Sequence, residues 1–165
     1  MIYNFSTTKE KRTVLNMETK RELAMKLFCD GFNCAQSIVG AFAKEMGLST
    51  EQAMKLSSPF GAGMGKMRHV CGAVSGMFMV LGMLEGYDSP TADREKAQLY
   101  EKVQSLANSF KEKNETIICA ELLEGLKVAG GHKPEERNEE YYKIRPCARF
   151  VGDAAEILEK HLNNK

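Results

Sequence analysis

The hydrophobic residues of the chain recur roughly every three to four positions, which is the spacing of one face of an α-helix. No segment shows a convincing alternation of apolar and polar residues, the pattern that is typical of a half-buried strand. We therefore predict an all-α protein, a single-domain bundle of about six to seven helices with little or no sheet. This domain would occupy residues 1–165, with residues 1–16 as a loosely ordered N-terminal extension.

The first part of the pattern has clear helix boundaries. It predicts a helix over residues 18–29 and a second over residues 34–46, with Asn33 as the N-cap of the second. The letters STEQ, residues 49–52, have the spacing of a capping box and predict the start of a third helix, which ends near Ser57.

A glycine-rich turn and a strongly apolar helix occupy the centre of the chain. We expect a loop over residues 58–70, which includes the letters GAGMG, and then a buried helix over residues 71–85. Gly72, Gly76 and Gly82 would each cost this helix up to ~1 kcal/mol relative to alanine. We infer that these glycines allow another helix or a cofactor to approach closely.

The second half of the pattern predicts three more helices. Ser89-Pro90 is a start signal for the first of them, Thr116 would cap the second, and residues 130–144 form a polar connection before the third. The predicted helices run over residues 91–113, 117–124 and 147–162.

Composition and charge exclude several classes of function. The formal net charge is +1, so no global field attracts nucleic acid or an anionic membrane. The longest apolar stretch is shorter than the ~18 residues of a membrane-spanning helix, and the first residues lack the pattern of a secretory signal. We expect a cytoplasmic protein with neither a nucleic acid nor a membrane as partner.

The five cysteines carry the most chemical information. An odd count in a reducing compartment argues against a disulfide framework, which leaves metal binding, thiol redox chemistry or plain burial. Four of the five begin predicted helices, where free backbone N–H groups and a partial positive charge stabilise a thiolate. These four are Cys34, Cys71, Cys119 and Cys147, whereas Cys29 ends a helix.

Four helix starts that converge on one point would suit thiolates around an iron–sulfur cluster, or a reactive dithiol pair. No Cys-x-x-Cys pair occurs, so any such site must be assembled by the tertiary fold. Cysteine also packs as a small hydrophobic residue, and this interpretation stays open. The cations nearest to Cys71 and Cys147 in the sequence are Arg68, His69, Arg145 and Arg149.

Other motifs give weaker indications of a nucleotide or metal site. The letters GAGMG lack the Lys-Ser/Thr of a phosphate-binding loop and follow no predicted strand, so we expect a turn that needs positive φ angles instead. The chain has only three histidines, and no Glu-x-x-His motif indicates a di-metal bundle. The methionines of the apolar helix are typical of core filling rather than of metal ligation.

Four segments together resemble the C_GCAxxG_C_C proteins, small proteins named for a cysteine, a central cysteine motif and two later cysteines. The segments are GFNCAQSIVGAF, FGAGMGKMRHVCGAVSGMFMVLGM, CAELL and RPCARFV, and the similarity extends over residues 18–158. The central motif departs from the family pattern, because residues 70–76 read VCGAVSG rather than a literal Gly-Cys-Ala-x-x-Gly.

The resemblance implies a redox role, which the family is given because of its cysteines. A related domain occurs in the split-Soret cytochromes, which implies an iron–sulfur site. Our leading hypothesis is therefore a small redox protein that binds an iron–sulfur cluster and passes electrons to a partner protein. By position, the family cysteines that would bind the cofactor or metal are Cys34, Cys71, Cys119 and Cys147.

Three alternatives stay open from the sequence. The first is a thiol–disulfide or peroxide-linked oxidoreductase with Cys71 as nucleophile and another cysteine to resolve it. The second is a non-redox helical interaction protein, such as a homodimer, whose cysteines are buried for packing. The third is a closed zinc site, which the absence of close cysteine pairs disfavours. The roles of Cys29 and His69 are not assigned.

Overall fold

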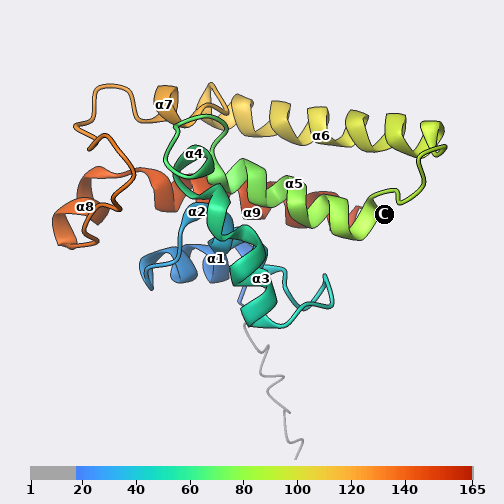
Figure 1. The fold of residues 1–165 in the computed structure, drawn as a ribbon, viewed down its shortest axis with the longest axis horizontal. Helices are drawn as coiled ribbons and strands as arrows, with labels where there is room; N and C mark the ends of the chain where they lie inside the picture. The colour runs from blue at the N-terminus through green and yellow to red at the C-terminus, as the bar shows by residue number, and fades with distance from the viewer. Residues whose placement is uncertain (1–17, 165) are drawn as a thin grey trace, which may run out of the picture.

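The computed structural model describes residues 18–164, and these residues are helices joined by short connections (Figure 1). Within this range no β-strand forms, and a single antiparallel bridge joins Val70 to Ile118, so the all-α prediction is confirmed. The predicted extension over residues 1–16 lies outside the described residues. The elements are α1 (Lys20–Cys29), α2 (Cys34–Ala41), α3 (Thr50–Ser57), the 3-10 turn η1 (Ser58–Phe60), α4 (Gly61–Met64), α5 (Gly72–Glu85), α6 (Asp93–Asn114), α7 (Cys119–Leu122), α8 (Glu139–Ile144) and α9 (Cys147–Asn163).

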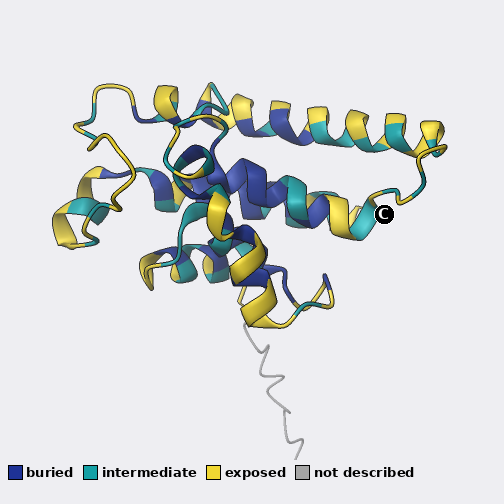
Figure 2. Cartoon of the chain, viewed as in Figure 1, coloured by how far each residue is buried: buried dark blue, intermediate teal, exposed yellow. Residues whose placement is uncertain are grey.

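Helices α5 and α9 lie at the centre of the fold. In the view of Figure 1, α5 runs between α6 on one side and α1, α2 and α3 on the other, and α9 lies behind it. Figure 2 shows that the first turns of α5 are buried, whereas α6 is mostly exposed. The largest fully buried side chains include Phe28, Phe42, Phe110, Ile38, Met77 and Leu158. In the described part of the chain, no helix combines the length and apolarity that crossing a membrane requires.

Two glycines of α5 let its first turns lie directly against α2. A Cβ atom at Gly72 would lie 2.8 Å from the carbonyl oxygen of Phe60 and 3.1 Å from the Cβ of Cys34. A Cβ atom at Gly76 would lie 2.9 Å from the Cβ of Ile38. The prediction of close approach is therefore confirmed for these two glycines. It is wrong for Gly82, whose Cβ would meet nothing within 4 Å.

The N-caps predicted in the first part of the chain are present. The side chain of Asn33 accepts a hydrogen bond from the backbone N–H of Gln36, and Gln36 caps the backbone N–H of Asn33 in return. Ser49 and Gln52 form the same reciprocal pair at the start of α3. The second helix is shorter than predicted, because after Ala41 the chain continues to residue 47 as turns.

Three boundaries in the second half differ from the prediction. Helix α6 begins at Asp93, because the Ser89 hydroxyl accepts from the N–H of Thr91 in a turn that precedes the helix. The Thr116 hydroxyl accepts from the N–H of Ile118 and so also lies before its helix, α7, which begins at Cys119. The predicted polar connection ends in the short helix α8, whose N-cap side chain is Asn138.

Candidate functional site: a cavity lined by four cysteines

Four cysteines that are far apart in the sequence line one cavity of about 270 Å³. Three of them are the first residues of α2, α7 and α9, and the fourth occupies the N-cap position of α5, so the predicted helix-start placement is confirmed. Cys29 is the last residue of α1, is exposed and is not among the lining residues. We refer to the four as the cavity cysteines: Cys34, Cys71, Cys119 and Cys147.

The glycine-rich loop brings two of the cavity cysteines together. The N–H of Cys71 donates to the carbonyl oxygen of Ile117 at 2.8 Å, and the N–H of Cys119 donates to that of His69 at 2.7 Å. Gly63 lies so close that a Cβ atom there would be 2.7 Å from the Cβ of Cys119. The loop is thus paired, backbone to backbone, with the segment that leads into α7.

The same loop is conformationally strained. Gly63 and Gly65 have φ angles of 72° and 60°, which confirms the predicted need for positive φ at this turn. Four residues that carry side chains share the left-handed region, where each costs about 1 kcal/mol or more. They are Ala62, Met64, Lys66 and Arg68.

Cationic side chains surround the cavity cysteines. Arg68 donates from Nη1 to the sulfur of Cys119 at 3.8 Å, and Arg68 and Arg145 both pair with the carboxylate of Glu135. Among the described residues, the lining carries four cations and one carboxylate, an excess of three positive charges. Such an excess favours anionic contents, thiolates included. The four cations are Lys66, Arg68, Arg137 and Arg145.

Cys147 is the cavity cysteine whose environment favours a thiolate. A hydrogen bond from the thiol of Cys34 lowers the pKa of Cys147, and the positive charges of Arg145 and Arg137 lower it further, against the effect of burial. The same hydrogen bond, together with burial, raises the pKa of Cys34 well above its usual value. The two thiols therefore form a donor–acceptor pair in which Cys147 loses its proton more easily than Cys34.

The other two cavity cysteines are held as neutral thiols. Burial raises the pKa of Cys71 to about 12, although the N–H groups of Ala73 and Val74 donate to its sulfur. Burial also raises the pKa of Cys119, in spite of the nearby guanidinium of Arg68. The expectation that every helix start would favour a thiolate holds for Cys147 alone. Desolvation raises the pKa of Cys71 and Cys119, and the hydrogen bond to Cys147, with burial, raises that of Cys34.

Several functional side chains escaped the sequence analysis. Glu135 and Arg137 stand in a polar run that looked like a solvated connection, and no local signal separates them from its other charges. Of the cations that flank cysteines in the sequence, Arg68 and Arg145 line the cavity. Arg149 instead donates to Asn114 at 2.8 Å, and the side chain of His69 is exposed.

The donor set can be compared with what metals require. In residues 18–164, no group of three or more His, Cys, Asp or Glu side chains is arranged to hold a metal ion. A zinc ion needs four ligand atoms within about 2.3 Å, so the alternative of a closed zinc site lacks support. In an iron–sulfur cluster the thiolates bind a larger inorganic unit, which spaces the ligand sulfurs further apart. The four thiols that line the cavity are the ligand type that such a cluster takes.

Comparison with known proteins gives one match. A model of the family described as "Putative redox-active protein (C_GCAxxG_C_C)" matches residues 32–161, which is more than half of the chain and includes all four cavity cysteines. Neither a curated protein nor a solved structure matches the chain.

Proposed function

Since the chain belongs to the C_GCAxxG_C_C family, we propose that it is an electron-transfer protein whose four cavity cysteines bind an iron–sulfur cluster. The observation that carries this proposal is the convergence of four cysteines, from four separate helix starts, on one cavity with an excess of positive charge. Cysteines kept only for packing would not require arginines beside their sulfurs. The hypothesis of a purely structural role therefore explains less of the site.

The cavity offers what a cluster needs. Thiolates are the ligands that iron–sulfur clusters prefer, and the surplus of cations offsets the negative charge of the cluster and its ligands. When bound, the cluster would supply one-electron transfer. The backbone N–H groups directed at Cys71 and the guanidinium at Cys119 would set its potential, because hydrogen bonds to ligand sulfurs stabilise the reduced, more negative state.

Anaerobic purification tests the proposal. We expect the wild-type protein to contain iron and acid-labile sulfide and to absorb visible light, with bleaching on reduction. Serine variants of each cavity cysteine should lose most of the iron, whereas Cys29→Ser, the matched control on an exposed cysteine, should keep it. A wild-type protein without iron or sulfide, after anaerobic reconstitution as well, would refute the cluster.

A second candidate function rests on the thiol pair of Cys34 and Cys147. The thiolate of Cys147 would attack a disulfide substrate and release one substrate thiolate; Cys34, losing its proton, would then attack the mixed disulfide. The products are a Cys34–Cys147 disulfide and the fully reduced substrate, so two electrons pass from the pair to the substrate. Cys71, the nucleophile expected from the sequence, is not supported in this role because its pKa is about 12.

A further inference from the structure

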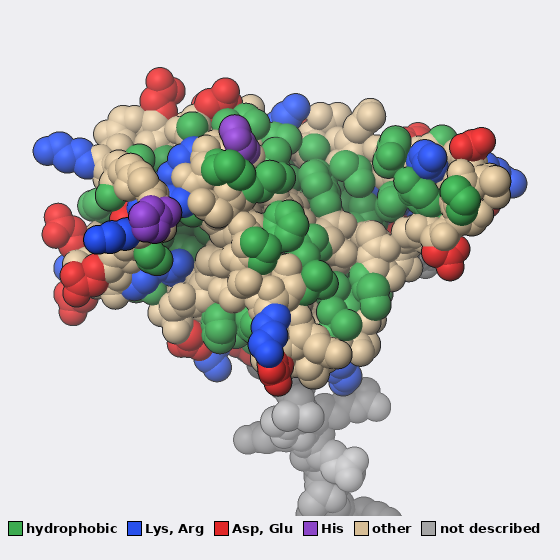
Figure 3. All heavy atoms as spheres, in the orientation of Figure 1, with side chains coloured by type: hydrophobic (Ala, Val, Ile, Leu, Met, Phe, Trp, Pro, Cys, Tyr) green, Lys and Arg blue, Asp and Glu red, His purple; other side chains and the backbone are tan. Residues whose placement is uncertain are grey.

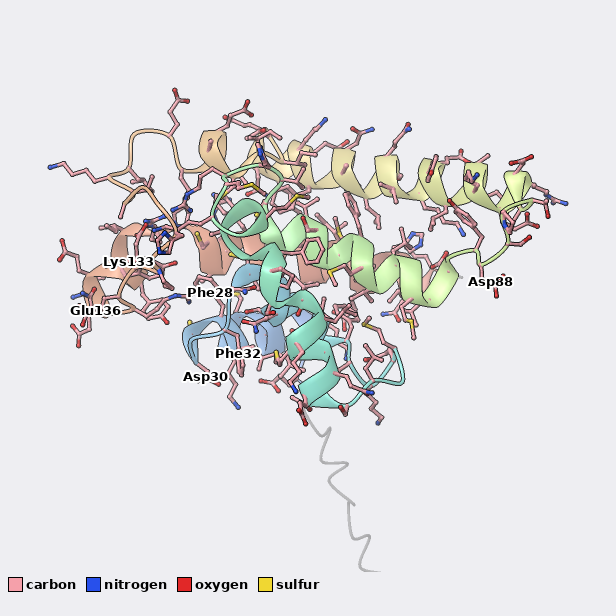
Figure 4. All side chains as sticks on the ribbon, viewed as in Figure 1. Phe28, Asp30, Phe32, Asp88, Lys133 and Glu136 are labelled. Carbon is pink, nitrogen blue, oxygen red and sulfur yellow. The ribbon has the colours of Figure 1, made fainter. Side chains whose placement is uncertain are left out.

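Part of the cavity wall is formed by residues 129–138, which belong to the connection between α7 and α8 and have no regular secondary structure. Its residues that line the cavity are His132, Pro134, Glu135 and Arg137. Figure 4 places Lys133 and Glu136 of this connection at the same end of the molecule as Phe28 and Phe32, and Figure 3 shows charged and histidine side chains crowding that end.

Polar contacts attach this connection to the rest of the molecule. Glu135 pairs with Arg145 and accepts a hydrogen bond from Arg68 at 3.3 Å. Arg137 donates to the carbonyl oxygens of Phe28 at 3.1 Å and Phe32 at 3.3 Å. The guanidinium of Arg137 also lies 4.4 Å from the centre of the Phe28 ring.

None of residues 129–138 is buried, and only Glu135 and Arg137 are even partly covered (Figure 2). Opening this connection would therefore expose little apolar surface, and water can replace its polar contacts. Segments with few buried apolar contacts open at low free energy. Beneath it, three of the cavity cysteines are buried. A wall segment without buried residues thus lines the same cavity as these three sulfurs.

We propose that residues 129–138 form a lid over the cavity cysteines, and that Glu135 is the latch that closes it by binding between Arg68 and Arg145. The closed lid shields the sulfurs from solutes, and the open lid admits small molecules such as thiol reagents and oxidants. This inference rests on the proposed function only in taking the cavity cysteines as the functional site. The contacts of the lid themselves involve no cluster.

The test compares Glu135→Gln with Glu136→Gln in the full-length, metal-free, reduced protein. Glu136 is the adjacent exposed carboxylate, so the control removes the same charge but leaves the contacts of Glu135 with Arg68 and Arg145 in place. We expect Glu135→Gln to raise hydrogen exchange of the 129–138 amides, and alkylation of cavity cysteines by a bulky maleimide, about fivefold, since a partly exposed salt bridge contributes up to about 1 kcal/mol. Glu136→Gln should stay within about twofold of wild type.

Loss of a negative charge could by itself make the thiols more reactive, and Arg137→Met separates this effect from lid opening. Removing the Arg137 cation disfavours the thiolate of Cys147, so electrostatics alone predicts slower alkylation. Release of the lid predicts faster alkylation by the bulky maleimide, together with faster exchange of the 129–138 amides. Protected amides in α5 should exchange as in wild type, which confirms that the variant is folded.

The outcomes are distinct from those of the proposed function. Wild-type exchange in both Glu135→Gln and Arg137→Met, or slower maleimide alkylation in Arg137→Met, would overturn the lid whatever the iron content. Absence of iron and sulfide combined with fast exchange in both variants would refute the cluster and leave the lid supported.

Discussion

The cavity has two walls that are built in opposite ways. The packed wall is made by the start of α2, the glycine-rich loop over residues 58–70 and the start of α5, where backbones approach so closely that Gly72 has no space for a Cβ atom. The charged wall is made by the lid over residues 129–138, by Arg145 and by Cys147. The packed wall fixes where sulfur atoms lie, and the charged wall controls their charge and their access to solvent.

The two walls also differ in the state of their thiols. Cys34 and Cys71 belong to the packed wall, and both have raised pKa values. Cys147 belongs to the charged wall, where its pKa is lowered. Burial thus favours the neutral thiol of Cys71, whereas the hydrogen bond between Cys34 and Cys147, with the nearby arginines, places the lower pKa on Cys147. The following predictions test this division, beginning with the largest effect.

In metal-free, reduced protein we expect iodoacetamide at pH 7.5 to modify Cys147 at least about thirtyfold faster than Cys71. The pKa of Cys71 is about 12, and that of Cys147 lies below 9.0, so the thiolate populations differ by more than about three powers of ten. The greater nucleophilicity of a more basic thiolate recovers about half of this difference. Peptide mass spectrometry after timed quenching measures both rates. Equal rates, or Cys71 reacting first, would contradict the division.

Gly72→Ala should destabilise the protein by about 2 kcal/mol, because the new Cβ would lie 2.8 Å from a backbone oxygen. The matched control is Gly82→Ala in the same helix, where the Cβ meets open space and alanine should stabilise by up to ~1 kcal/mol. Urea unfolding measures both. A neutral Gly72→Ala variant that retains the cavity cysteines' reactivity would show that the packed wall is looser than its contacts indicate.

Asn33→Ala should cost about 1 kcal/mol, because Asn33 caps the helix that begins with Cys34 and also donates to the carbonyl oxygen of Ser58 at 3.0 Å. Ser49→Ala removes the same type of cap from α3 and should cost a similar amount. The two variants should differ in the alkylation rate of Cys34, which only Asn33→Ala is expected to change. The same alkylation rate of Cys34 in both variants would show that the Asn33 cap does not affect the site.

The smallest effect concerns pH and the charged wall. Burial raises the pKa of Glu135, but the hydrogen bond and charge of Arg145, with the charge of Arg68, lower it to a net value below the usual 4.5. A lowered carboxyl pKa stabilises the closed lid above about pH 4.5, and this contribution is lost as the pH falls below that value. The 129–138 amides should exchange several-fold more slowly in wild type than in Glu135→Gln at pH 7. Near pH 3 the two proteins should exchange at the same rate. A constant ratio would mean that Glu135 is no latch.

The local sequence determined much of the helical framework. Asn33 and the STEQ letters specify their caps through contacts that extend over three residues, and these predictions agree with the structure. Ser89-Pro90 and Thr116 carry similar letters, yet their side chains bond within turns that precede the helices. The neighbouring residues identify a possible N-cap, but the tertiary contacts of the helix decide whether the helix begins there.

The sequence by itself determined that the protein is helical and that four of its five cysteines begin helices, because periodicity and capping act over a few neighbouring residues. The tertiary structure alone decided that these starts surround one cavity, that Cys147 rather than Cys71 favours the thiolate, and that Glu135 and Arg137 line the cavity. Desolvation and charge depend on groups brought together from distant parts of the chain, such as Arg145 beside Cys147 and Cys34. No short stretch of sequence contains that information.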